Sequence, residues 1–180
     1  MKLKKIINIY GGPGVGKSTL AAGLFHNMKI AGFNVEYVTE YAKDLVYEDR
    51  LNVLSDDQLY IFAKQHRKIL RLKDTVEYIV TDSPLLFSIA YNRMNVNSIY
   101  DSDSFEDLVL SVYKQYPSQD LFLIRKENIK YETHGRTQTY NEALLVDSSI
   151  FSILQSLGIN IVPAFNEEGL ISEIIQQNNT

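Results

Sequence analysis

The chain has 180 residues, a length that favours one domain with a substantial hydrophobic core. It contains no cysteine, which excludes disulfides and thiolate metal sites and suits a cytoplasmic location. Its net charge of −4 argues against a broad nucleic-acid-binding surface, and no apolar run approaches the roughly 20 residues of a membrane helix, so no membrane partner is expected.

The first predicted strand, Lys5–Tyr10, leads directly into Gly-Gly-Pro-Gly-Val-Gly-Lys-Ser at positions 11–18. Its apolar part is too short for the core of a signal peptide. The eight residues match Gly-x-x-x-x-Gly-Lys-Ser between a buried strand and a helix, the context in which this pattern binds phosphate. The glycines allow backbone N–H groups to converge on a phosphate chain. The residues expected to bind the nucleotide are Gly12, Pro13, Gly14, Val15, Gly16, Lys17, Ser18 and Thr19.

Two side chains of this loop carry distinct predicted roles. Lys17 is expected to reach the β- and γ-phosphates of ATP, and Ser18 is expected to bind Mg²⁺. The following helix, predicted to end near Ala31, adds partial positive charge at its N-terminus. The sequence therefore predicts a site for a nucleoside triphosphate, with ATP and Mg²⁺ as cofactors.

The second predicted strand, Phe33–Thr39, ends at Glu40, on the sheet edge that also holds the phosphate loop. An acid at this place can accept a proton from a substrate hydroxyl that attacks the γ-phosphate. The alternative is a solvated glutamate, or a partner for Lys43. Lys43 itself is a candidate for contact with substrate or phosphate, and Tyr41 for stacking on a ring or for packing.

A capping box, Ser55 with Gln58, predicts the start of a long helix that runs to about Lys73. Gln65 lies beside the apolar stripe of this helix, where its amide could read a nucleobase edge or mark a packing boundary. The segment 64–73 carries five basic residues, which could meet DNA phosphates or form a solvated face.

The third predicted strand, Val76–Thr81, ends at Asp82. Ligands of open parallel sheets bind outside the carboxyl ends of the strands, so Asp82 is the candidate Walker B acid that holds the Mg²⁺ shell. The alternative is that Asp82 assists Ser83 in capping a helix, with Pro84 in the first helical position.

Further along the chain, the pattern predicts a helix at Phe105–Tyr116 and a fourth strand at Asp120–Ile124. The polar segment 125–138 follows and is interpreted as a lid that closes on phosphates, the alternative being a solvated charged loop. Arg125 and Arg136 are its candidate catalytic residues, because the guanidinium fork matches phosphate geometry.

A second capping box, Thr139 with Glu142, predicts a helix that ends near Leu157. A fifth strand at Ile159–Val162 and a helix to about Gln176 complete the chain. The alternation of strands and helices predicts an α/β fold, a three-layer sandwich of one five-stranded parallel sheet with helices on both faces.

These motifs together resemble the compact P-loop kinases, with an AAA-type ATP-binding domain. That group includes the ribosylnicotinamide kinase domain of bifunctional bacterial regulators of NAD biosynthesis and many bacteriophage nucleotide or DNA-base kinases. The resemblance is carried by positions 11–18, Thr39–Asp44, Gln65, Thr81–Pro84, Gly135, Arg136, Glu142 and Ala143. It implies a P-loop NTPase sheet ordered 2-3-1-4-5 and one kinase domain over residues 1–180.

The resemblance also implies ATP-dependent phosphorylation of a nucleoside-like acceptor, with Glu40 or Asp82 as the acid near that acceptor. The second hypothesis is a polynucleotide kinase of phage type that acts on 5-hydroxymethyluracil in DNA. The third hypothesis is an NTPase module without an acceptor. A homodimer is compatible with each, and a phage-encoded enzyme would work in the cytoplasm of its bacterial host.

Overall fold

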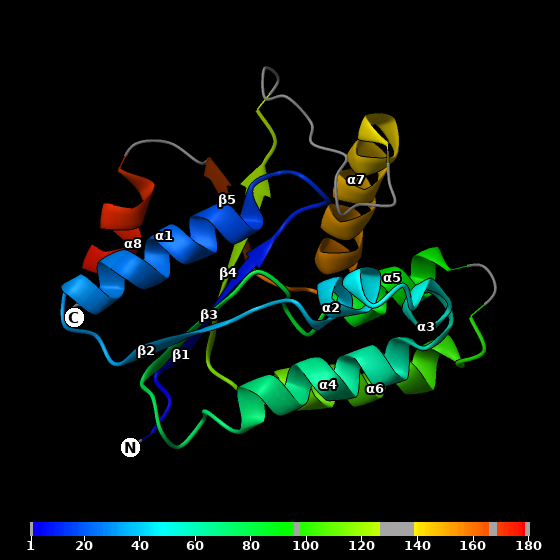
Figure 1. Cartoon of the computed structure of the whole chain (residues 1–180), viewed down its shortest axis with the longest axis horizontal. Coiled ribbons are helices and arrows are strands. Elements are labelled where there is room, and N and C mark those ends of the chain that lie inside the picture. The colour runs from blue at the N-terminus through cyan, green and yellow to red at the C-terminus, as the bar shows by residue number, and fades with distance from the viewer. Residues whose placement is uncertain (1, 96–97, 127–138, 166–168, 179–180) are drawn as a thin grey trace.

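A computed structural model of the chain describes residues 2–95, 98–126, 139–165 and 169–178 (Figure 1). Five parallel strands form one sheet in the order β2-β3-β1-β4-β5, which confirms the predicted fold class and strand order. The strands are β1 (Lys5–Tyr10), β2 (Val35–Val38), β3 (Tyr78–Thr81), β4 (Ser118–Ile124) and β5 (Ile161–Phe165).

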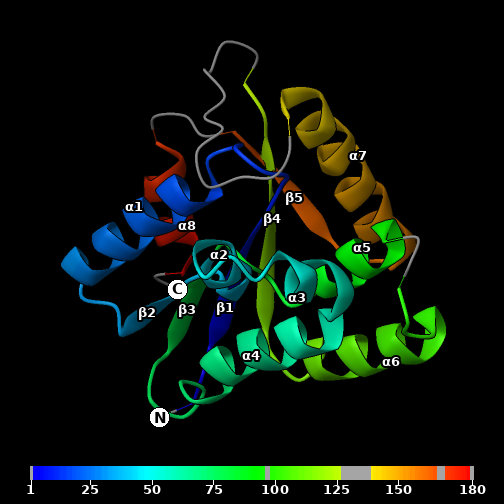
Figure 2. The ribbon, with the colours of Figure 1, turned by 45° about the vertical axis from the view of Figure 1, so that its right-hand side comes forward.

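Helices cover both faces of the sheet, which makes the molecule a three-layer sandwich (Figures 1 and 2). One face carries α1 (Lys17–Ile30) and α8 (Leu170–Asn178). The opposite side carries α4 (Gln58–Leu70), α5 (Phe87–Met94), α6 (Ser102–Tyr113) and α7 (Tyr140–Ser156). None of the helices in the described ranges is long and apolar enough to cross a membrane.

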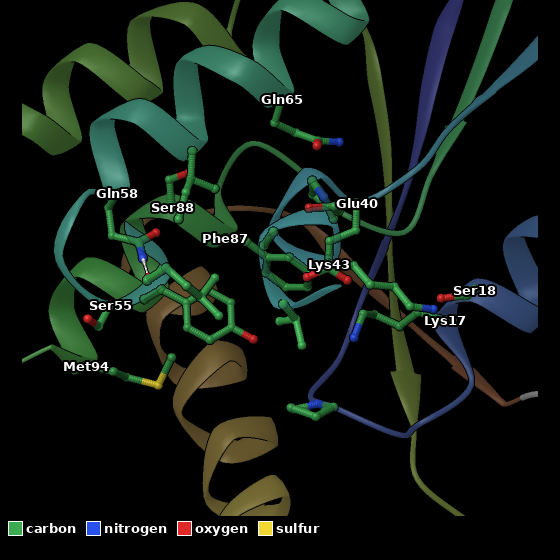
Figure 3. A pocket seen from close by; sticks show the side chains of 18 of the residues that line it. Lys17, Ser18, Glu40, Lys43, Ser55, Gln58, Gln65, Phe87, Ser88 and Met94 are labelled. Carbon is green, nitrogen blue, oxygen red and sulfur yellow. Dashed lines mark hydrogen bonds between the residues drawn. The ribbon is translucent and has the colours of Figure 1, made fainter. Parts of the chain in front are cut away.

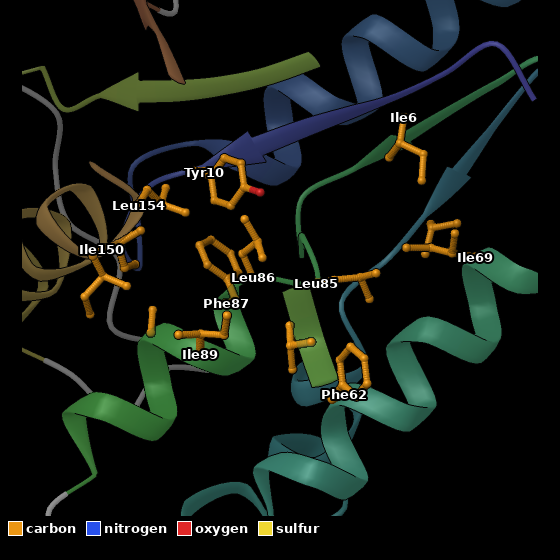
Figure 4. Close-up of a cluster of buried hydrophobic side chains, with 14 of the residues drawn as sticks. Ile6, Tyr10, Phe62, Ile69, Leu85, Leu86, Phe87, Ile89, Ile150 and Leu154 are labelled. Carbon is orange, nitrogen blue, oxygen red and sulfur yellow. The ribbon is translucent and has the colours of Figure 1, made fainter. Parts of the chain in front are cut away.

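The central strand β1 contributes to a hydrophobic core on each face. Ile7 and Ile9 belong to the cluster under α1, whereas Ile6 and Tyr10 belong to the cluster under the opposite helices (Figure 4). This alternation follows from the two-residue period of a strand. Because both faces of β1 are buried, the strand gives the phosphate loop that follows it a rigid base.

Two short helices, α2 (Tyr41–Tyr47) and α3 (Leu51–Asp56), lie in a region for which the sequence predicted no element. The predicted Ser55 capping box is wrong, because Ser55 lies within α3. Helix α4 is capped instead by Asp57, whose side chain accepts the N–H of Tyr60 at 2.9 Å. Helix α3 extends to Asp56, so the next residue, Asp57, is the first that can take the N-cap position of α4.

Other boundaries also differ from the prediction. Helix α5 begins after Leu86, so neither Ser83 nor Pro84 starts a helix. The N–H of Ser83 donates instead to Oγ1 of Thr81 at 3.1 Å, which folds the chain into a turn directly after β3. The second capping box is confirmed, because Thr139 and the third helical residue of α7 bond reciprocally.

Candidate nucleotide and acceptor site

The phosphate loop connects β1 to α1 through a backbone path that only glycine adopts readily. Gly11, Gly14 and Gly16 have φ values of 134°, 75° and 102°, a region that side chains with a Cβ disfavour. Lys17 opens α1, and its Nζ donates to the carbonyl oxygen of Gly12 at 2.9 Å. Lys17 therefore lies against the phosphate loop, and its predicted contact with the phosphates stays a prediction.

A pocket of about 790 Å³ opens beside the loop (Figure 3). One end of the pocket contains Lys17 and is formed by residues from the segment 13–19. The rest of the wall comes from α2 to α5 and the turns next to them. In Figure 3, Lys17 and Ser18 lie at one end of the pocket, and Ser55 and Met94 lie at the other. A volume of this size falls within the range of pockets that enclose a small ligand.

Glu40 lies between the loop and the wider part of this pocket. It occupies the N-cap position of α2, directly after β2, and lines the pocket together with Lys17 (Figure 3). Burial raises the pKa of Glu40, and the charge of Lys17 opposes that shift. Burial also lowers the pKa of Lys17, against the charges of Glu40 and Asp82. The three predicted charged residues therefore act on one another electrostatically.

Asp82 is buried, with a relative exposure of 3%, at the end of β3. Its Oδ2 accepts a hydrogen bond of 2.8 Å from the hydroxyl of Tyr37, and its Oδ1 is buried with no hydrogen-bond partner. Oxygen atoms of this kind, with the hydroxyl of Ser18, are ligands that Mg²⁺ prefers.

In the part of the chain that the structure describes, no three carboxylate or imidazole side chains converge on a metal position. A magnesium ion held by Ser18 and Asp82 would therefore need phosphate oxygens and water to complete its shell, as is usual for Mg²⁺ in nucleotide sites. The donor set fits a metal that enters with the nucleotide.

Gln65, from α4, lines the pocket, and only the nitrogen of its amide is available to bind a ligand. Its Oε1 accepts the backbone N–H of Tyr41 at 3.0 Å, and its Nε2 is buried without a partner. Lys43 also lines the pocket. The side chain of Tyr41, in contrast, is not part of the pocket wall, because its hydroxyl donates to Tyr60 at 2.9 Å.

Arg125 lies beside the phosphate loop, where it bonds to the loop and to α7. Its Nε donates to Oδ2 of Asp147 at 2.6 Å, and its Nη2 donates to the carbonyl oxygen of Pro13 at 2.7 Å. The guanidinium thus supports the phosphate loop from the side of α7 and is absent from the pocket wall. Arg136 and the rest of the predicted lid after residue 126 lie outside the described residues.

Asp147 is a residue that sequence reasoning missed. Its Oδ1 accepts the backbone N–H of Gly12, so the carboxylate links Arg125 to the phosphate loop. A Cβ on Gly12 would lie 2.5 Å from Oδ1 of Asp147 and 2.9 Å from the carbonyl oxygen of Ala143. Position 12 therefore needs glycine for close packing against α7, and nothing in the local sequence around Asp147 signals this contact.

One family model, described as an AAA domain, matches residues 6–167. No curated protein matches the chain.

Solved structures with similar folds include a deoxyadenosine kinase from M. mycoides with dCMP and dCDP, at 16% identity, with a TM-score of 0.61 over 97% of this chain and 98% of that one. The same enzyme with bound dATP matches at 17% identity and a TM-score of 0.59, over 97% of this chain and 100% of the other.

A NadR protein in complex with NR matches at 16% identity and a TM-score of 0.66. The match covers 98% of this chain but 51% of that protein. At these identities the likeness establishes the fold of the chain.

Proposed function

Because the chain belongs to the AAA domain family, we propose that it binds ATP with Mg²⁺ and transfers the γ-phosphate to a hydroxyl of a nucleoside-like small acceptor. The observation that carries the proposal is the place of Glu40. This acid lines the same pocket as Lys17, and the pocket continues past it along α3 to α5, where we infer that a second substrate binds (Figure 3). The deoxyadenosine kinase neighbours support it through their shared fold.

In the proposed reaction, Lys17 holds the β- and γ-phosphates while Glu40 orients the acceptor hydroxyl and accepts its proton. Ser18 and Asp82 would hold Mg²⁺, which supplies charge neutralisation at the phosphates when bound. The bond from the acceptor oxygen to the γ-phosphorus forms as the bond to the β,γ-bridging oxygen breaks, and ADP leaves. Catalysis then comes mainly from positioning and electrostatics.

The charges of the pocket favour an uncharged acceptor. Of the described residues that line it, only Lys17, Glu40 and Lys43 are charged, and Lys17 belongs to the ATP side. A monophosphate would bring further negative charge next to Glu40 with a single remaining lysine to balance it. Away from the loop, the wall combines apolar side chains, such as Ile61, Phe87 and Met94, with uncharged polar ones, such as Gln58 and Ser88. A nucleoside is therefore a better match than a nucleotide.

Gln65 is proposed to contact the ring of that acceptor. With its Oε1 engaged by Tyr41, the amide offers a donor only, and a buried donor without a partner carries a desolvation cost that a ligand can relieve. A carbonyl oxygen or an unprotonated ring nitrogen would satisfy it. Lys43 is proposed to lie near the acceptor or the migrating phosphoryl group.

The test uses γ-labelled ATP, Mg²⁺ and a panel of acceptors. The panel contains nucleosides, nucleoside monophosphates, nicotinamide riboside, and DNA with and without 5-hydroxymethyluracil. Label transferred to a free nucleoside is the expected result and identifies the substrate. Label released only as free phosphate would contradict the kinase proposal and favour an NTPase module.

Phosphorylation of 5-hydroxymethyluracil in DNA is the second candidate, and one observation favours it. Lys64 lies over the ring of Tyr60 at 5.2 Å, and Lys68 lies over the ring of Tyr41 at 5.6 Å, on the helix that also contributes Gln65 to the pocket. Cationic and aromatic side chains together suit a single nucleic-acid strand. Label in DNA alone, lost on Lys64→Ala, would establish this candidate over the first.

A further inference from the structure

Tyr37 joins three elements next to the phosphate loop. It lies on β2, paired with Val80 of β3, and its ring packs against Phe25 of α1 with the centroids 6.3 Å apart. From this half-buried position its hydroxyl donates the 2.8 Å hydrogen bond to Oδ2 of Asp82. The ring is thus held by packing, and the hydroxyl is held against the carboxylate at the end of the neighbouring strand.

This hydrogen bond makes the two oxygens of Asp82 unequal. Oδ2 is held by Tyr37, while Oδ1 is buried with no partner. A carboxylate with one oxygen fixed presents the other in a defined direction, which is how outer hydrogen bonds orient metal ligands in proteins. The free oxygen is the one that remains for a cation or its water.

We propose that Tyr37 is a positioning residue that fixes the carboxylate of Asp82, so that its unpartnered Oδ1 remains for the magnesium ion of the nucleotide. The proposal rests on the proposed function, because it assumes that ATP binds here with Mg²⁺. It predicts that the hydroxyl of Tyr37 contributes to the metal-dependent part of nucleotide affinity and not to the metal-independent part.

The experiment measures binding of a non-hydrolysable ATP analogue by calorimetry, once with excess Mg²⁺ and once with EDTA. Tyr37→Phe keeps the ring packed against Phe25 and removes only the hydroxyl. The expected result is that the gain in affinity on adding Mg²⁺ falls about tenfold, the scale of outer-shell losses at metal sites, while the affinity in EDTA stays unchanged. A thermal melt of each variant reports whether it is folded.

The matched control is Tyr113→Phe, which removes a hydrogen bond of 2.7 Å between another tyrosine and a buried aspartate, Asp120. Asp120 lies within β4, where it also accepts hydrogen bonds from Asn8 and Tyr10. This variant is expected to keep the full Mg²⁺ gain.

Three results overturn the proposal. An unchanged Mg²⁺ gain in Tyr37→Phe overturns the inference alone. An equal loss of affinity with Mg²⁺ and with EDTA also overturns it, because Tyr37 would then shape the loop and not the metal position. No binding by the wild-type protein under either condition would overturn the proposed function together with the inference.

Discussion

At the scale of single residues, Glu40 tests the mechanism most directly. Glu40→Gln keeps the size of the side chain but cannot accept a proton, so kcat is expected to fall by roughly 10²- to 10⁴-fold, the usual contribution of a general base. Affinity for ATP should change little. Steady-state kinetics with the acceptor identified in the labelling panel provides the measurement. Glu48→Gln, an exposed glutamate that follows α2, is the matched control and should retain wild-type rates.

The pH profile of the wild-type enzyme gives a second test of the same residue. Burial raises the pKa of Glu40 above the ordinary glutamate value, so its carboxylate becomes protonated while the pH is still above 4.5. We expect kcat/KM to fall as the pH is lowered through that raised pKa. A profile that stays flat down to pH 4.5 would show that Glu40 is not the base.

The surroundings of His66 lead us to expect a pH dependence of the unfolding free energy that is separate from catalysis. Its Nε2 lies 2.9 Å from the hydroxyl of Tyr116, its ring stacks on Phe62, and burial lowers its pKa. The unfolded chain then binds a proton more readily, so the free energy of unfolding should fall as the pH drops through about 6.5. Urea unfolding at pH 7.5 and 5.5 measures this fall. His66→Gln should reduce it, and replacing the exposed His26 should not.

The positions of residues were predictable where they follow from place along the chain. Glu40 and Asp82 come directly after strands of a parallel sheet, and the structure brings both to the phosphate loop. The hydrogen-bond partners of Arg125 and Tyr41, which are Asp147 and Tyr60, were not predicted, because they lie 22 and 19 residues away in the sequence. A single sequence contains no signal for such pairings.

At the scale of elements, the contact between α7 and the phosphate loop depends on the Arg125–Asp147 pair, whose side chains are 10% and 15% exposed. Asp147→Asn can still accept the N–H of Gly12 but leaves the guanidinium without a counter-charge. We expect a loss of about 3 kcal/mol in unfolding free energy and weaker ATP binding. Denaturant titration and calorimetry measure the two effects.

The double variant with Arg125→Gln should lose less than the sum of the single losses, because both changes remove one interaction. Lys29→Gln, which breaks the exposed Lys29–Glu36 pair of 3.1 Å, serves as the control. It should cost less than about 1 kcal/mol. Additive losses at Arg125 and Asp147 would show that the pair does not act as a unit.

Elements were predictable where a local signal marks their ends. The capping box at Thr139 placed the start of α7 correctly. Helices α2 and α3 have no side-chain cap hydrogen bond and are only 7 and 6 residues long. Both helices line the pocket, yet α2 has one buried residue and α3 has none, so neither leaves a periodic apolar pattern in so short a segment.

At the scale of the whole molecule, nucleotide binding should stabilise the fold. The loop lies between the central strand β1 and α1, so a ligand bound there stabilises the folded chain only. At 100 times Kd, MgATP should add about 2.7 kcal/mol, a rise of roughly 5–10 °C in melting temperature for a chain of this size.

Lys17→Ala should abolish turnover and most of this rise, since it removes the cation that holds the phosphates. Differential scanning fluorimetry with and without MgATP is the measurement. A full thermal shift in the variant would mean that the nucleotide binds elsewhere.

The walls of the pocket have a simple distribution along the chain. Among the described residues, the nucleotide end comes from 13–19, and every other lining residue comes from 40–95. The proposed acceptor side of the pocket thus comes from one contiguous stretch of the chain, which also contains β3. An exchange of this stretch between relatives would change the acceptor side of the pocket while the phosphate loop stays the same, provided that the acids at positions 40 and 82 are kept. A laboratory chimera could be made in the same way.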